Sequence, residues 1–211
     1  MRVGWTAVCV AMLGLGALWA EGRMNTPFTG TEPLGVFEGE TVFGAESGSV
    51  RSSVDFDPDT GEYLIERSAA SRCAFPDDFH IVWRRLRGDF LVRTRAEFVG
   101  EGADTHRNLG WLATASLEPG APWVKLAVHG NGLATLTRGP GQGHGGVDKT
   151  LFSAVEAPTV IQLSRRGNTF SMAVARFGEP LGRDEFIKDD LGDEVFVGLY
   201  ACSRDQEPES G

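Results

Sequence analysis

The stretch from Gly88 to Phe98, GDFLVRTRAEF, alternates between apolar and charged residues and sets the strongest limit on the fold of this chain. One side of the stretch carries Phe90, Val92, Thr94, Ala96 and Phe98, and the other side carries Arg93, Arg95 and Glu97; only Leu91 breaks the pattern. A period of two over this length indicates a strand with one side in a core and the other in solvent. The sequence therefore predicts a half-buried antiparallel strand here.

Similar short runs of β-branched, aromatic and aliphatic residues recur along the chain and are separated by turn residues. The predicted strands are Val50 to Phe56, Glu62 to Ser68, Phe79 to Leu86, Asp89 to Phe98, Leu109 to Ser116, Trp123 to His129, Leu133 to Arg138, Thr159 to Ser164, Thr169 to Phe177 and Glu194 to Cys202. Short strands at this spacing are typical of antiparallel sandwiches and barrels. We therefore expect an all-β fold.

The connections between these strands carry recognisable turn chemistry. Residues 57–61, DPDTG, offer a proline with fixed φ and a glycine that tolerates positive φ, and residues 166–168, RGN, offer glycine and asparagine for the same purpose. We predict a hairpin at each place. Residues 139–146 hold five glycines and are expected to form a loop, whereas residues 184–190 could form one or two helical turns.

The first residues have the composition of an export signal. Arg2 precedes an uninterrupted apolar run from Val3 to Ala20. We predict that residues 1–22 are a cleaved signal peptide or an uncleaved membrane anchor, and that the protein is secreted or periplasmic. An irregular lead-in with at most one short strand would follow over residues 23–47, then one sandwich domain over residues 48–205 and an acidic tail over residues 206–211.

Charge and cysteine content limit the partners and the covalent links. With 20 basic and 29 acidic residues, the chain has a formal net charge of −9, which disfavours nucleic acid as a partner. Cys9 lies in the apolar leader, so Cys73 and Cys202 are the remaining pair. An oxidising compartment would allow a disulfide between them, but buried free thiols explain the same residues.

The carboxylates of Asp55, Asp57, Asp59 and Glu66 fall at positions 1, 3, 5 and 12 of a calcium-loop template. Position 6, which should be glycine for the sharp turn, is Thr60. The hairpin explains these residues without a metal. We expect no metal site and no cofactor.

The polar side of the central strand is the candidate recognition surface. Guanidinium and carboxylate groups form directed hydrogen bonds with hydroxyls, and an indole ring can stack on a sugar. The candidate ligand-binding residues are His80, Arg93, Arg95, Glu97, Trp111 and His129. Alternating charges on a solvated strand, and buried hydrogen-bonded histidines, explain the same residues without a ligand.

No motif for catalysis is recognisable in the sequence. A glycosidase of this fold would usually show alternating carboxylates as E-x-D-x-x-E, which is absent, and neither a G-x-S-x-G elbow nor a phosphate-binding Gly-Lys-Ser/Thr loop occurs. Glu97 and Glu101 are four residues apart across a strand end and need not share a face. We therefore name no catalytic residue and expect a non-enzymatic protein.

Several segments resemble the concanavalin A-like domain of unknown function that occurs alone or attached to TolB-like β-propeller proteins in bacteria. The matching segments, in order, are DDFHIVWRRLRGDFLVRTRAEFVGEG, HRNLGW, VHGNGL, VIQLSRRGNTFSMAVARFGEP and LGDEVFVGLYACS, within residues 48–205. The resemblance implies a two-sheet antiparallel β-sandwich of jelly-roll type and little about activity, because fold does not fix function.

The chain departs from that family at several positions. Similar domains often carry Trp near Cys73, Arg near Thr114, and a Gln-aromatic-Arg run where this chain has residues 137–139, TRG. They also continue into one more strand where this chain ends, a strand that residues 34–43 could replace. Several polar groups of the presumed recognition surface are therefore missing.

From the residues and the resemblance together, we expect an exported, non-catalytic binding module for a carbohydrate or another envelope polymer. The expected partners are a polysaccharide or an envelope protein, without nucleic acid, and a membrane only if the N-terminal segment is uncleaved. Two alternatives stay open. One is a glycoside hydrolase or lyase acting through carboxylates such as Glu97, and the other is a structural docking domain.

Overall fold

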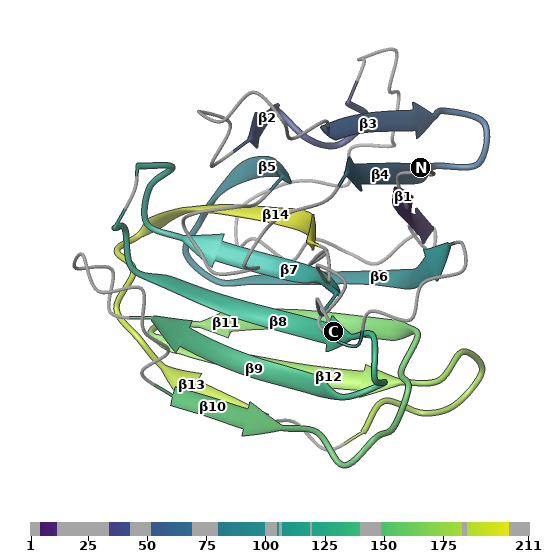
Figure 1. The fold of residues 1–211 in the computed structure, drawn as a ribbon. Coiled ribbons are helices and arrows are strands. Elements are labelled where there is room, and N and C mark those ends of the chain that lie inside the picture. Colours follow the sequence, from purple (N-terminus) through teal and green to yellow (C-terminus); the bar gives the residue numbers. More distant parts are fainter. Residues whose placement is uncertain are drawn as a thin grey trace, which may run out of the picture.

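The structure is a computed structural model, and it describes residues 5–11, 34–42, 52–68, 80–99, 105, 107–118, 120–139, 149–182 and 185–202. These residues form two seven-stranded sheets that lie face to face, with β8 to β10 in front of β11 to β13 in Figure 1. Sheet A has the order β13-β12-β11-β6-β1-β4-β3, and sheet B has the order β10-β9-β8-β7-β14-β5-β2.

The strands of sheet A are β1 (Trp5–Ala11), β3 (Ser52–Asp57), β4 (Glu62–Ser68), β6 (Phe90–Val99), β11 (Val160–Arg166), β12 (Thr169–Ala175) and β13 (Glu185–Lys188). The strands of sheet B are β2 (Gly39–Val42), β5 (His80–Arg87), β7 (Asn108–Thr114), β8 (Trp123–His129), β9 (Ala134–Gly139), β10 (Lys149–Phe152) and β14 (Glu194–Cys202). All the strand pairs described are antiparallel. The expected all-β, two-sheet antiparallel sandwich is confirmed. No helix long and apolar enough to span a membrane occurs in the described ranges.

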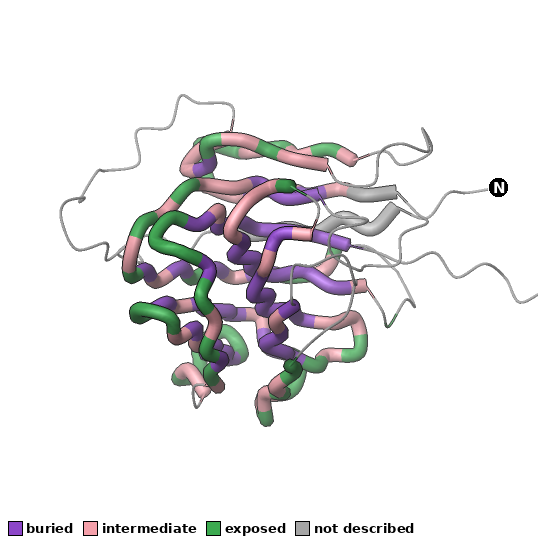
Figure 2. Tube along the Cα trace, turned by 90° about the vertical axis from the view of Figure 1, so that its left-hand side faces the viewer, coloured by how far each residue is buried: buried purple, intermediate pink, exposed green. Residues whose placement is uncertain are grey.

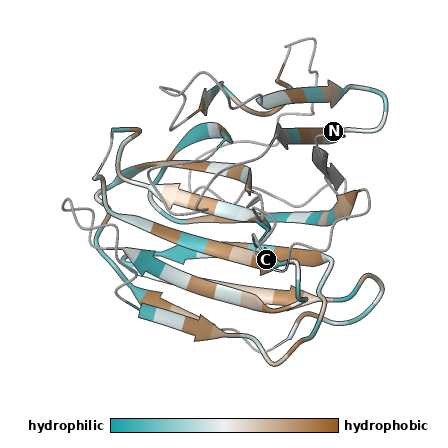
Figure 3. Cartoon of the chain, viewed as in Figure 1, coloured by the Kyte–Doolittle hydropathy of each residue, from teal (hydrophilic) through white to brown (hydrophobic). Residues whose placement is uncertain are grey.

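The main core lies between the two sheets. Apolar and polar residues alternate along several strands, and the buried residues follow the strands in the middle of the molecule (Figures 2 and 3). In β6, Phe90, Val92, Thr94 and Ala96 are buried, as the alternation predicted. The inward rows of both sheets supply the rest of this core, including Leu109, Trp111, Leu126, Leu136, Ile161, Leu163, Phe170, Met172, Val197 and Leu199.

Both predicted hairpins are confirmed. In the β3–β4 turn, Gly61 has a φ of 72° and donates its N–H to Asp57 O (2.8 Å), and in the β11–β12 turn Gly167 has a φ of 54°. The Asp57 carboxylate accepts from the N–H of Asp59 (2.9 Å), which holds the pKa of Asp57 below its usual value. The carboxylate proposed for the calcium-loop template thus stabilises the turn itself.

Two short edge strands were not predicted. Residues 185–188 form β13 rather than a helical turn, because Ile187 is fully buried and the segment pairs along β12. β10 pairs along β9 at the edge of the other sheet. Of the predicted glycine-rich loop, Gly139 ends β9, and the rest lies outside the described residues.

Two strands come from the segments expected to precede the domain. β2, from the lead-in, pairs with β5, and β1, from the segment expected to be a leader, lies between β4 and β6. Removal of that segment stays a prediction. The side chain of Cys202 is buried and disulfide-bonded, whereas Cys73 lies outside the described residues.

Candidate ligand-binding site

Three of the predicted recognition residues lie together on the outer face of sheet A. Arg93 donates from Nε (2.8 Å) and Nη2 (2.5 Å) to Oε1 of Gln162 on β11. Arg95 donates from the same two nitrogens to Glu97 Oε1 (2.8 and 2.5 Å), and its guanidinium lies 4.6 Å from the centre of the Phe177 ring. These groups largely satisfy one another, as expected of a solvated strand face.

The other three predicted residues do not join that face. His80 is buried at the start of β5, where Nε2 donates to Glu40 Oε2 (3.0 Å) and Nδ1 is hydrogen-bonded with Ser52 Oγ of β3, so it links the two sheets. His129 is on β8, with Nε2 3.0 Å from Thr135 Oγ1. Trp111 is 2 % exposed in the core between the sheets. The six residues therefore form no single surface.

The outer face of sheet B carries the large aromatic residues Trp83, Trp123 and Tyr200. Each lies across the strand pair from a glycine. The pairs are Trp83 with Gly39 and with Gly198, Trp123 with Gly139, and Tyr200 with Gly110. A Cβ on Gly139 would lie 2.3 Å from the Trp123 ring, so this indole lies directly over the glycine.

Lys125 lies on the same face between two of these rings. Its Nζ is 5.6 Å from the centre of the Trp123 ring and 5.8 Å from that of Tyr200, within the range of cation–π attraction. Burial lowers the pKa of Lys125 to about 8. The side chains of Trp123, Lys125 and Tyr200 are at most 8 % exposed, so these three are not open to a ligand, whereas Trp83 on the same face is partly exposed.

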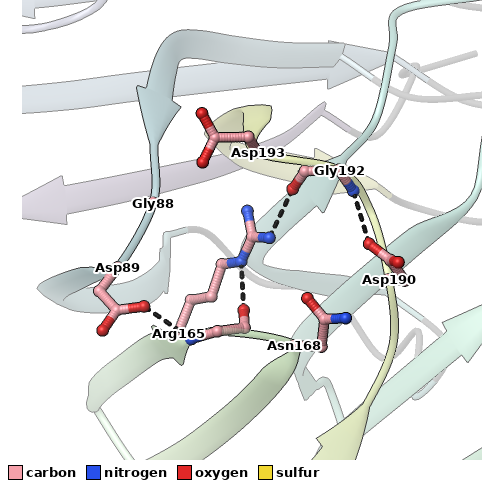
Figure 4. A pocket seen from close by; sticks show the side chains of 8 residues that line it. Gly88, Asp89, Arg165, Asn168, Asp190, Gly192 and Asp193 are labelled. Carbon is pink, nitrogen blue, oxygen red and sulfur yellow. Dashed lines mark hydrogen bonds between the residues drawn. The ribbon is translucent and has the colours of Figure 1, made fainter.

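An open pocket of about 410 Å³ lies instead at one end of the sandwich (Figure 4). Three connections build it, namely the β5–β6 turn, the β11–β12 turn and the segment between β13 and β14. Its lining residues are Gly88, Asp89, Arg165, Gly167, Asn168, Asp190, Gly192 and Asp193. Loops held by a rigid scaffold are frequent sites of binding.

Arg165 is the central polar group of this pocket. It follows Ile161 and Leu163 on the inward row of β11, is 4 % exposed, and lies 5.4 Å from the centre of the Phe170 ring. Its Nε donates to Gly167 O (2.7 Å) and its Nη2 donates to Gly192 O (2.5 Å). Its Nη1 has no hydrogen-bond partner, and no carboxylate of the described residues forms an ion pair with it. One buried guanidinium nitrogen of a residue that lines the pocket is thus left without an acceptor, which is unusual for a buried polar group.

Asp89, Asp190 and Asp193 line the pocket on three sides of Arg165 (Figure 4). Asp89 Oδ1 accepts from Gly167 N (2.6 Å) and Asp190 Oδ1 accepts from Gly192 N (3.1 Å). These bonds fix the loops and leave the second oxygen of each carboxylate for other partners. The pocket lining therefore combines the carboxylate oxygens of Asp89 and Asp190, which are held in place, with Arg165 Nη1, a donor without an acceptor.

The sequence carried a signal for this site that was not used. The period of two puts Arg165 on the inward row of its strand, where an apolar residue is expected. A charged residue is rarely buried without a partner. The three loops meet only through the strand pairing, so the aspartates could not be assigned to one place from sequence spacing.

Comparison with known proteins adds little. No family model and no curated protein matches the chain. Among solved structures, the crystal structure of a functionally unknown protein from Saccharomyces cerevisiae is similar over 60 % of this chain and 66 % of that chain, with a TM-score of 0.44 and 15 % sequence identity. A likeness this distant supports no argument about function, and the concanavalin A-like resemblance stays a prediction.

Proposed function

We propose that this protein is an exported, non-catalytic carbohydrate-binding module of concanavalin A-like fold, and that its ligand enters the end pocket around Arg165. The observation that carries the proposal is the buried Nη1 of Arg165, a residue that lines the pocket, because this nitrogen has no acceptor among the described residues. A buried donor left unsatisfied is costly, and a ligand oxygen would remove that cost.

The chemistry of the lining fits hydroxyl groups. A hydroxyl accepts a hydrogen bond from a guanidinium and donates one to a carboxylate at the same time. Asp193 and Asn168 present side chains that no protein group hydrogen-bonds among the described residues. Neighbouring hydroxyls of a sugar ring could therefore bridge the deeper guanidinium and the acceptors at the rim. A negatively charged ligand fits poorly, because three carboxylates surround one cation.

The test is binding of the purified chain to a glycan array, followed by calorimetric titration with the best ligand. Asn168→Ala and Asp193→Asn each remove a rim group that does not hold the fold. We expect each to weaken binding by about tenfold, because a hydrogen bond to a charged or amide group is worth roughly 1–3 kcal/mol.

Glu156→Gln is the matched control. Glu156 is an exposed carboxylate in the connection before β11, at the end of the sandwich opposite the β11–β12 turn, and its change should leave binding unaltered. The chain should release no reducing ends from the bound glycan. Absence of binding to any glycan, or equal binding by all variants, would refute the proposal.

A further inference from the structure

We infer that the saccharide bound in the end pocket carries amino groups, so that the module prefers a cationic, deacetylated glycan over neutral or acidic ones. The inference rests on the proposed function and concerns the same pocket. It follows from the balance of charges that the loops place around Arg165.

The pocket has an excess of negative charge. Three carboxylates, Asp89, Asp190 and Asp193, face one guanidinium. The charge of Arg165 is directed at backbone oxygens, since Nε and Nη2 donate to Gly167 O and Gly192 O. None of the three aspartates forms an ion pair within the described part of the chain.

The nearby cation Arg87 does not neutralise this excess. It lies close enough to Asp193 to sense its charge, but its Nε donates to Glu194 Oε2 (2.7 Å), and its side chain is 74 % exposed. Glu194 adds a further carboxylate beside the pocket. A ligand ammonium would therefore meet three carboxylates that form no ion pair among the described residues.

The depth of the groups gives the ligand an orientation. Arg165 is 4 % exposed, so its guanidinium lies deeper than the side chains of the three aspartates, which are exposed. A ring or hydroxyl oxygen would accept from Nη1, and an amino group on the neighbouring ring carbon would reach the carboxylates at the rim. An amino sugar has this pairing of an oxygen acceptor and an ammonium group on adjacent atoms.

The net charge of the whole chain favours the same ligands. A formal charge of −9 attracts polycations and repels polyuronates over the range of the screening length. This long-range attraction is not specific to the pocket. The test therefore has to separate attraction by net charge from recognition in the pocket. Variants that each remove a single carboxylate make this separation.

The experiment compares three oligosaccharides of equal length, namely a glucosamine oligomer, its N-acetylated form and a galacturonic acid oligomer. Titration calorimetry is done at about pH 6, where an amine with a pKa near 8 is protonated. The salt concentration is about 0.05 M and then about 0.5 M, so that screening can be assessed. We expect the glucosamine oligomer to bind at least about tenfold more tightly than the acetylated form at low salt, and the acidic oligomer to bind weakest.

The variants decide whether the preference comes from the pocket. Asp193→Asn should remove most of the preference for the amine, whereas Glu156→Gln, which removes the same charge far from the pocket, should keep it. An equal loss in both variants would overturn the inference, because it would indicate attraction by net charge alone.

Different results would refute the amine preference and carbohydrate binding itself. Equal or tighter binding of the acetylated oligomer, still weakened by Asn168→Ala, overturns the amine preference and leaves carbohydrate binding in the pocket supported. Absence of binding by all three oligosaccharides overturns the amine preference as well, and a glycan array without hits then refutes carbohydrate binding itself.

Discussion

At the scale of single residues, the side chains that matter most here are polar groups in apolar positions. Arg165 occupies the inward row of β11, and Lys125 lies between Trp123 and Tyr200 on the outer face of sheet B. Both could be found from the sequence, since the period of two places each of them in a row with apolar residues of its own strand. Their surroundings could not, because the neighbouring rings and carbonyls come from distant strands.

Lys125 predicts a pH dependence of stability. Burial lowers its pKa from 10.5 to about 8, so between these values the unfolded state binds more protons than the folded state. The free energy of unfolding should therefore rise as the pH is raised from about 8 to about 10, by up to roughly 1 kcal/mol per pH unit. Urea unfolding at a series of pH values measures this rise, and Lys125→Met should flatten it.

Tyrosine ionisation should end this rise in stability above about pH 10. Burial raises the pKa of Tyr63 to about 12, from an ordinary value of 10.0, so above about pH 10 the unfolded state loses this proton first and stability falls. A Lys125→Met protein with an unchanged slope between about pH 8 and 10 would contradict the assignment to Lys125.

Gly110 predicts a second effect on stability. A Cβ at this position of β7 would lie 1.9 Å from Leu126 O on β8, and a main-chain atom cannot move aside without disturbing the sheet. Gly110→Ala should destabilise the protein by about 3 kcal/mol or more. Thermal unfolding measures this loss, with Gly178→Ala as the control. Gly178 has a φ of +87°, but no atom lies within 4 Å of an added Cβ, so Gly178→Ala should cost about 1 kcal/mol. Equal costs would contradict the steric argument.

At the scale of elements, sheet A depends on one strand. Among the described strands, β1 joins the β3–β4 hairpin to β6, since it pairs with β4 on one side and with β6 on the other. The long strands β6 and β14 were predictable, because β6 alternates between apolar and polar residues over ten residues and β14 is an almost continuous apolar run of nine. β10 and β13 have four residues each, which is too short for a period to be recognised.

Loss of β1 should loosen the β3–β4 hairpin. A chain that begins at residue 23 lacks the hydrogen-bond partners of β4 and of the end of β6, so amides of residues 62–68 should exchange with solvent much faster than in the full chain. Hydrogen exchange followed by mass spectrometry compares the two chains, and amides of β8, in the middle of the other sheet, are the internal control. Equal protection of residues 62–68 in both chains would show that β1 does not hold the hairpin.

At the scale of the whole molecule, the candidate site is a product of topology. The pocket is built by the β5–β6 turn, the β11–β12 turn and the segment before β14. Together they span residues 88–193 of the chain, yet they meet at one end of the sandwich. The predicted recognition residues were instead chosen from one strand and from isolated aromatic and histidine residues. Only Arg93, Arg95 and Glu97, which share that strand, were brought together.

The sequence by itself determined the all-β fold, most strand positions and both hairpins, because period-two alternation and turn chemistry act over a few neighbouring residues. It also determined the acidic character that argues against nucleic acid. The tertiary structure alone decided which strands pair, that Trp111 belongs to the core, and that Asp89 lines one pocket with Arg165, Asp190 and Asp193. The physical reason is that pairing and burial depend on contacts between residues far apart in the chain, which no local pattern encodes.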